Sequence, residues 1–225
     1  MSKIYIPAVS ADQWAQFLAD PVKHWRKGYS ARTLAYSWQE ANGFPIEVQR
    51  FLATQFPDIE LLLAFPEHQV PLLGGSRPSQ NDIWVLARSA GNLISIAVEG
   101  KVSETFGPTV QEWRAEASSG KSERLNFLCG QLGIQSDVPD TLRYQLLHRT
   151  VSALIEATRF GAAHAVMLQQ PAMALCLRPV EGIPGEGARV HEQGKRVDLQ
   201  GLGHHRRLRE KGERLPYQGT GILSL

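Results

Sequence analysis

Two acidic residues and a lysine stand at matching ends of two neighbouring apolar runs. Asp82 opens the run 82–88, and Glu99 and Lys101 close the run 93–101. Both runs are rich in β-branched residues, and only a short segment containing a Gly-Asn pair separates them. This pattern predicts a β-hairpin with the charged residues at its open end.

The turn between the runs decides which residues face each other. A short loop places Arg88 opposite Leu93, and counting outward from that pair places Asp82 opposite Glu99. Opposed side chains on one sheet face have Cβ atoms about 4.5–5.5 Å apart, where like charges destabilise the pairing. Because side chains alternate along a strand, Lys101 shares the face of Glu99. We therefore expect Lys101 beside two closely spaced carboxylates.

Such a group suits a divalent cation. Mg²⁺ prefers oxygen ligands and often takes one or two carboxylates, with water and substrate phosphate in the remaining positions. The small side chains of Ser95 and Ala97 on the same face leave room below the acids. The alternative is a solvated hairpin end in which the three charges merely offset one another, and a one-residue change of loop length would separate them.

Composition indicates one intracellular domain. The chain has 225 residues, 43% hydrophobic and 20% charged, which is ordinary for a soluble protein. Its formal net charge of +2 is too small to indicate nucleic acid by itself. Cys129 and Cys176 lack metal-type spacing and suit a reducing compartment. We find no signal-peptide pattern and no run long enough to cross a bilayer, so we expect a cytoplasmic protein without membrane contact.

Periodicity predicts alternating helices and strands. A segment over 66–81, with three prolines and a Gly-Gly pair, is typical of a loop, and its Glu67 and His68 could border a site. The longest periodic segment, 141–160, has a continuous apolar stripe. The predicted helices cover residues 11–18, 30–41, 45–55, 109–117, 123–132 and 141–160, and the predicted strands cover 59–65, 82–88, 93–101 and 163–168.

Polar residues elsewhere could complete a site. Glu40, on the helix 30–41, is a candidate third acid, although a solvent-facing helix glutamate would look the same in sequence. A second set could contact a phosphate backbone, or could equally form a solvated surface. Its members are Arg77 in the predicted loop and Gln145, His148 and Arg149 in the first half of the helix 141–160.

The last quarter of the chain differs in character. Residues 169–225 hold nine of the 20 glycines and a series of basic residues with interleaved histidines, without a hydrophobic period. Such a segment buries too little apolar surface to offset its ordering entropy, so we predict a domain over 1–168 and a poorly ordered tail over 169–225. The tail could bind nucleic acid nonspecifically. It could also be an out-of-frame reading of a GC-rich gene, which sequencing the parent gene would settle.

The element order with these motifs resembles a known nuclease core. A helix, a strand, a two-stranded hairpin, a helix and a strand follow one another over about residues 30–168, with an acid opening the second strand and Glu-x-Lys closing the third. This resembles the PD-(D/E)XK nuclease superfamily. Three stretches, 29–31, 66–68 and 142–150, are also similar to an uncharacterised bacterial domain family placed in that superfamily.

The resemblance implies a fold and a set of roles. The fold would be α/β with a restriction-endonuclease-like core, αβββαβ, whose mixed central sheet is flanked by helices. Asp82 would take the place of the motif's aspartate, Glu99 that of its second acid and Lys101 that of its lysine. Glu40 would be the helix acid of some members. Asn81 stands where the motif often has proline.

The implied activity is metal-dependent hydrolysis of phosphodiester bonds. Asp82 and Glu99 would hold Mg²⁺ or Mn²⁺, with Glu40 for a second ion, and Lys101 would assist the attacking water or stabilise charge on the phosphate. The partner would be nucleic acid, DNA first, and a homodimer would allow both strands to be cut. Two other readings stay open: a non-catalytic nucleic-acid-binding or protein-interaction protein that retains the fold, and a purely structural charge cluster.

Overall fold

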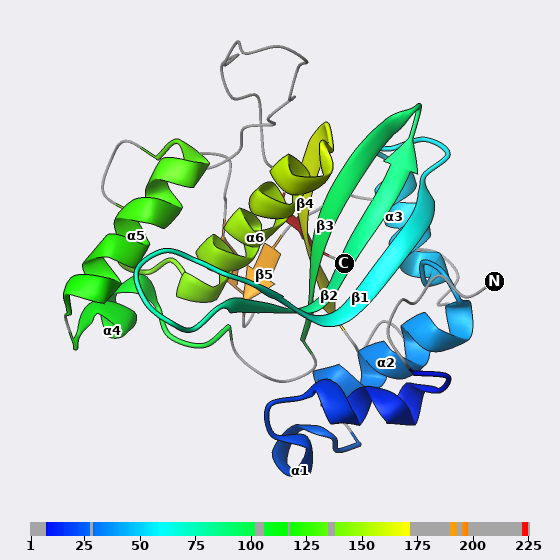
Figure 1. Ribbon diagram of the computed structural model, residues 1–225, viewed down its shortest axis with the longest axis horizontal. Helices are drawn as coiled ribbons and strands as arrows, with labels where there is room; N and C mark the ends of the chain where they lie inside the picture. Colours follow the sequence, from blue (N-terminus) through cyan, green and yellow to red (C-terminus); the bar gives the residue numbers. More distant parts are fainter. Residues whose placement is uncertain are drawn as a thin grey trace.

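The computed structural model describes most of the chain. It covers residues 8–27, 29–101, 106–116, 118–134 and 138–171, with three short strands beyond them (Figure 1). The helices are η1 (Ala11–Phe17, a 3₁₀-helix), α1 (Pro21–His24), α2 (Ser30–Ala41), α3 (Ile46–Ala53), α4 (Val110–Arg114), α5 (Ser119–Leu132) and α6 (Tyr144–Phe160). The strands are β1 (Glu60–Val70), β2 (Ser79–Ser89), β3 (Asn92–Lys101), β4 (His164–Pro171), β5 (Val190–Glu192), β6 (Lys195–Val197) and β7 (Ile222–Ser224).

An open mixed sheet organises the described residues. Its strand order is β1-β2-β3-β4-β7. Strand β2 is antiparallel to both β1 and β3, whereas β4 runs parallel to β3 and β7 parallel to β4. A parallel pair needs a long crossover, which the helices between β3 and β4 supply. The predicted α/β class, with a mixed sheet flanked by helices, is therefore confirmed.

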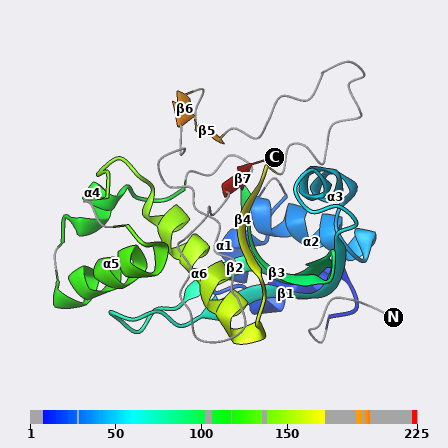
Figure 2. The same cartoon turned by 90° about the horizontal axis from the view of Figure 1, so that it is seen from above.

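Helices cover both faces of the sheet. On one face, α2 and α3 pack against a core that includes Ile94, Ile96 and Val98, none of which is exposed. On the other face α6 lies across the strands, with α5 packed against α6 (Figure 2). The Oγ atom of Ser95 donates to the carbonyl of Ala153 in α6 at 2.8 Å, so the helix lies directly on this face. We call it the α6 face.

The hairpin forms as its sequence predicts. Its turn residues, Ala90 and Gly91, have φ angles of 47° and 79°. Two successive positive φ values match the right-handed twist of the flanking strands, which is why short hairpins favour them. Arg88 pairs with Leu93, and the ladder continues outward to Ile83 and Val98, which confirms the predicted register.

The segment 66–81 is only partly a loop, and its interpretation as a loop throughout was wrong. The strand β1 continues to Val70, and β2 already begins at Ser79. Proline is tolerated in β1 because this strand lies at the edge of the sheet, where a missing N–H leaves no ladder bond unmade. Glu67 has a φ of 51°, an irregularity that the sequence pattern does not signal.

Two helices begin elsewhere than predicted. The helix predicted from residue 141 starts at Tyr144, because Arg143 is extended and forms an isolated bridge with Thr109. The helix predicted from residue 123 starts at Ser119, where the Ser118 side chain accepts a hydrogen bond from the Lys121 N–H at 3.2 Å. Serine caps satisfy an orphan donor of the first turn, so a segment that looked like a break begins the helix.

Most of the predicted tail, 169–225, lies outside the described residues, and its order stays a prediction. The strand β4 runs three residues past the predicted boundary at 168, to Pro171. Among the described helices, none has both the length and the apolar composition that crossing a bilayer requires.

Candidate active site

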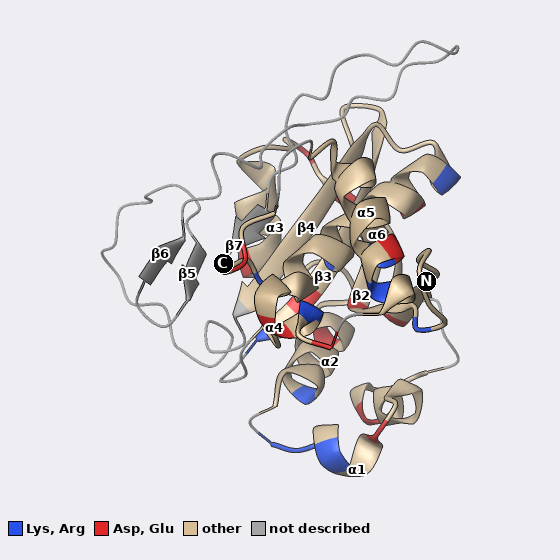
Figure 3. Cartoon of the chain, turned by 90° about the vertical axis from the view of Figure 1, so that its left-hand side faces the viewer, with Lys and Arg blue, Asp and Glu red and all other residues tan. Residues whose placement is uncertain are grey.

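Asp82 and Glu99 occupy opposed positions at the open end of the hairpin. The last ladder pair is Ile83 with Val98, and the next residues outward are Asp82 and Glu99. The backbone N–H of Gly100 donates to Asp82 Oδ2 at 2.8 Å, in place of a further ladder bond. Figure 3 shows acidic and basic positions of β2, β3 and α6 close together in this part of the molecule.

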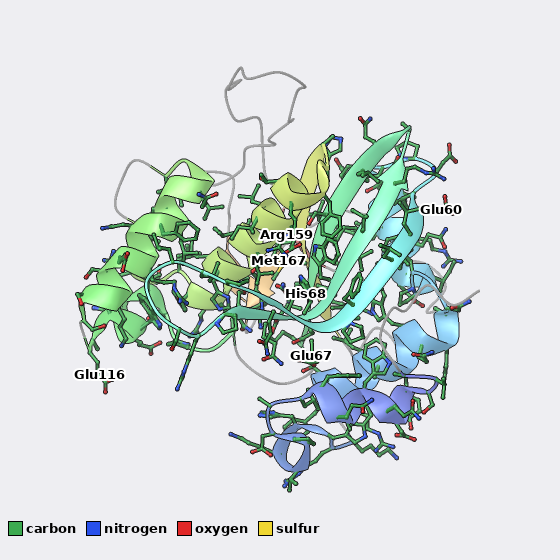
Figure 4. The ribbon with its side chains drawn as sticks, in the orientation of Figure 1. Glu60, Glu67, His68, Glu116, Arg159 and Met167 are labelled. Carbon is green, nitrogen blue, oxygen red and sulfur yellow. The ribbon has the colours of Figure 1, made fainter. Side chains whose placement is uncertain are left out.

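A third carboxylate extends this arrangement onto β1. His68 pairs with Asn81, so the preceding residue of β1, Glu67, lies opposite Asp82. The side-chain amide of Gln80 donates to Glu67 Oε2 at 2.7 Å. Figure 4 shows Glu67 toward the end of β1 that is far from Glu60. Glu67, Asp82 and Glu99 thus form one row across three strands, which we call the carboxylate row.

Glu99 is buried and held by three side chains. Only 2% of its surface is exposed. Its Oε1 atom accepts hydrogen bonds from Lys101 Nζ at 2.8 Å and from Gln145 Nε2 at 2.6 Å. Its Oε2 atom accepts from Arg149 Nε at 2.7 Å. Charge-assisted bonds of this length fix a carboxylate firmly, because each is roughly twice as strong as a neutral bond.

The other two acids of the row carry raised pKa values. Burial, reinforced by the charge of Glu99, raises the pKa of Asp82 to about 7. Burial, reinforced by the charge of Asp82, raises the pKa of Glu67 to about 8. Among the described residues neither acid forms an ion pair within 4 Å. A cation between these buried acids would therefore stabilise their ionised forms.

The carboxylate oxygens of the row suit a hard divalent cation in their chemistry, but their present positions do not enclose one. Carboxylate oxygens are the ligands such ions prefer. Within the described ranges no three Asp, Glu, His or Cys side chains converge tightly enough to enclose a metal. Glu99 already accepts three bonds, so an ion bound by Asp82 and Glu99 requires Lys101 or Gln145 to turn away from Oε1.

A hydrogen-bonded chain leads from the row into α6. Arg149 Nη1 donates to Ser79 Oγ at 3.1 Å, and Ser79 Oγ lies 2.8 Å from His148 Nδ1. The serine hydroxyl accepts from Arg149, and its Oγ also lies 3.4 Å from the carbonyl oxygen of His148, so the tautomer of the ring decides the direction of the bond to Nδ1. Burial, with the nearby charge of Arg149, lowers the pKa of His148 well below its usual range. The His148 ring is therefore neutral.

His148 also lines a pocket of about 490 Å³, so the hydrogen-bonded chain connects the row to this pocket. We call this the basic pocket, and the residues that matter for its chemistry are Arg77, Trp113, Lys121, Arg124, Tyr144 and His148.

One family comparison identifies the chain. Residues 7–171 match the family described as a domain of unknown function, DUF6946. The chain belongs to DUF6946. No curated protein and no solved structure matches it. The DUF6946 region ends at the last residue of β4 and contains all the candidate residues named above.

The structure brings together most of the residues predicted for the site of this DUF6946 chain. Asp82, Glu99 and Lys101 meet on the α6 face, and Gln145 and Arg149 reach Glu99 from the first half of α6. The other two predicted binding residues lie apart from the carboxylates, in the basic pocket. They are Arg77, which is exposed, and His148.

Two expectations about the surroundings of the DUF6946 site were not met. Glu40 is exposed near the end of α2, whereas Ser30 and Leu34 in the first half of that helix face Gly100. Glu40 lies six positions after Leu34, about 9 Å further along the helix axis, so it does not join the row. The expected space over Ser95 and Ala97 is filled by α6, and both residues are fully buried.

Glu67 takes the place in the row that Glu40 was expected to have. Its sequence position beside His68 only suggested a site border. Predicting its pairing with Asp82 would have required the length of the loop between β1 and β2, which the proline and glycine pattern did not reveal. Lys121 and Arg124 were missed because nothing in the sequence places α5 beside the loop that follows β1.

Proposed function

We propose that this DUF6946 chain hydrolyses phosphodiester bonds in nucleic acid with a divalent metal ion, on a restriction-endonuclease-like core. The observation that supports this most is the opposition of Asp82 and Glu99 on neighbouring strands, with Lys101 bonded to Glu99 at 2.8 Å. The parallel strand β4 beside β3 agrees with the strand arrangement of that core.

The carboxylate row is the proposed metal site. Asp82 and Glu99 would hold Mg²⁺ or Mn²⁺. Glu67, which lies opposite Asp82, would contribute a third carboxylate in place of Glu40 only after its side chain turns toward the ion. When bound, the ion supplies charge neutralisation at the phosphate and lowers the pKa of a coordinated water. The raised pKa values of Glu67 and Asp82 support this assignment, because a cation favours their ionised forms.

The surrounding side chains position the reacting groups. Lys101 lies between Glu99 and the ring of Phe106, whose centroid is 5.3 Å from Nζ. From there its ammonium group can donate to a phosphate oxygen or to the attacking water. Gln145 and Arg149 hold Glu99 from the helix side, so its carboxylate keeps one orientation. Such preorganised donors stabilise developing charge without reorganising during the reaction.

A cleavage assay tests the proposal. Purified protein is incubated with supercoiled plasmid or single-stranded DNA in Mg²⁺ or Mn²⁺, with Glu99→Ala and Lys101→Ala as variants. Matched controls are Glu60→Ala and Arg88→Ala, which break an exposed ion pair at the other end of the hairpin. The proposal expects metal-dependent cleavage that both site variants abolish and both controls retain. Cleavage that survives Glu99→Ala and Lys101→Ala eliminates the assignment.

A second candidate is a non-catalytic nucleic-acid-binding or protein-interaction protein that retains this fold. The observation that favours it is the engagement of both Glu99 oxygens by Lys101, Gln145 and Arg149. Calorimetric titration with Mg²⁺ separates the candidates. Heat of binding that Asp82→Asn removes supports the hydrolase, and an absence of binding even with DNA present supports the non-catalytic protein.

A further inference from the structure

We infer that the basic pocket binds a phosphate group of the nucleic-acid strand, next to the phosphodiester that the carboxylate row would cleave. This subsite rests on the proposed function for its substrate, but its geometry is separate from the row. The pocket lies between the loop that follows β1, the helix α5 and the start of α6.

The pocket presents cationic donors and no acid. Among the described residues that line it none is Asp or Glu, whereas Arg77, Lys121 and Arg124 are basic. Arg77 is exposed and Lys121 is half-buried, so both can turn toward a bound group. The carboxylate row, at the other end of the hydrogen-bonded chain from His148, has the opposite character. A phosphate therefore has a favourable potential in the pocket and an unfavourable one at the row unless a metal ion is bound there.

The wall of the pocket is fixed before any ligand arrives. Arg124 Nε donates to the carbonyl of Leu73 at 2.7 Å, and its Nη2 donates to the carbonyls of Leu72 and Gly75 at 3.2 and 3.0 Å. Gly74 has a φ of 82°, and a Cβ at this position would collide with the backbone of Arg124. Arg124 thus holds the loop in place, and Arg77, two residues past Gly75, is presented from a rigid base.

His148 contributes a neutral donor to the same pocket. In the tautomer whose Nδ1 accepts from the Ser79 hydroxyl, Nε2 carries the proton and can donate it to a ligand. A phosphate oxygen is an acceptor and matches it. The chain from His148 through Ser79 and Arg149 to Glu99 fixes the orientation of this ring relative to the row. Phosphate contacts of this kind set the register of a strand on a protein without reading its sequence.

An aromatic wall completes the pocket and suits a nucleotide. The rings of Trp113 and Tyr144 stack at 4.0 Å with planes 10° apart, and Lys121 Nζ lies 5.5 Å from the centroid of Trp113. The volume of about 490 Å³ falls within the range of small-ligand sites, about 300–1,000 Å³. It accommodates a phosphate with its sugar. Free phosphate or a mononucleotide carries the same group, so the experiment must separate these sources from a strand.

The test measures the salt dependence of binding to a fluorescein-labelled single strand of about 12 nucleotides, in EDTA so that no cleavage occurs. The variant is Arg77→Ala with Lys121→Gln. Its matched control is Arg50→Ala with Lys23→Gln, which removes two exposed charges from α3 and α1. Each phosphate contact contributes about 0.7 to the slope of log K against log salt. The pocket variant should lower the slope by about 1.4 and weaken binding about 25-fold at about 0.1 M salt, and the control should change neither.

Two outcomes overturn the inference. One is a pocket variant that binds with the slope and affinity of the wild type, or a control that loses as much as the pocket variant. The other is binding of inorganic phosphate or of a mononucleotide that depends on Arg77 and Lys121 while strand binding does not, which assigns the pocket to a free ligand.

The same measurements keep this inference distinct from the proposed function. Pocket-dependent strand binding without cleavage in any metal leaves the subsite standing and removes the hydrolase. Metal-dependent cleavage that Arg77→Ala with Lys121→Gln leaves unchanged, together with unchanged binding, removes the subsite and leaves the hydrolase.

Discussion

Replacing Asp82 by asparagine probes the electrostatics of the carboxylate row. The substitution keeps a side-chain oxygen that can accept the hydrogen bond of 2.8 Å from the Gly100 N–H. It removes the charge that faces Glu67 on one side and Glu99 on the other. If the row is a site of uncompensated charge, the protein without metal becomes more stable.

The structure gives the size and the sign of this effect. The pKa of Asp82 rises from 3.8 to about 7, chiefly through burial. One pKa unit corresponds to about 1.4 kcal/mol, so the full shift sets an upper limit of about 4 kcal/mol. Part of the shift is shared with Glu67, and the Asp82 side chain keeps some contact with solvent, so we expect a stability gain of about 1–2 kcal/mol. Because the folded state holds the proton more tightly, wild-type stability should fall as pH rises from about 4 to about 7.

Urea unfolding in EDTA across this pH range is the assay. The difference between Asp82→Asn and the wild type should be near zero at about pH 4 and reach its full value above about pH 7. Asp58→Asn is the control, because Asp58 is exposed and asparagine tolerates its φ of 56°. Adding Mg²⁺ should stabilise the wild type and the control but not Asp82→Asn. A variant that is no more stable than the wild type at pH 8 refutes the electrostatic reasoning.

Three further variants test the supports of the row. Gly100→Ala should lose about 1–3 kcal/mol of unfolding free energy, because the added Cβ would overlap the Leu34 side chain. A thermal melting temperature equal to that of the wild type would contradict this close contact. Arg149→Met should cost about 3–5 kcal/mol in urea unfolding, because it leaves the buried Oε2 atom of Glu99 without its partner, and a loss below about 1 kcal/mol argues against a buried pair. Ser79→Ala should cost about 1–2 kcal/mol, and an unchanged midpoint means that its bonds are not formed.

The hairpin and its register could be predicted because they depend on local chemistry. A two-residue turn with positive φ at Ala90 and Gly91 fixes which residues pair across the hairpin, because turn type and loop length set the register. The positions of Asp82, Glu99 and Lys101 follow from that register. Gln145 and Arg149 lie one helical turn apart on a strongly periodic helix. The sequence alone therefore predicts that their side chains lie on the same face of that helix.

The remaining parts of the site depend on tertiary packing. Pro66 looked like the end of a strand, but its place at a sheet edge lets β1 continue and brings Glu67 opposite Asp82. Glu40 was assigned to the site from the element order, yet the first half of α2 contacts β3. The basic pocket arises where Arg124 of α5 meets the loop after β1, residues about 50 positions apart in sequence, and no local pattern records such a contact.

Mn²⁺ binding by the carboxylate row is the most direct test of the central claim. Electron paramagnetic resonance of free Mn²⁺, titrated with purified protein, reports how much of the ion is bound. We expect stoichiometric binding to the wild type and to Asp58→Asn, and loss of that binding in Asp82→Asn and Glu99→Gln. Binding that persists unchanged in both row variants, or wild-type protein that leaves the Mn²⁺ signal at full intensity, would contradict the assignment of the row as a metal site.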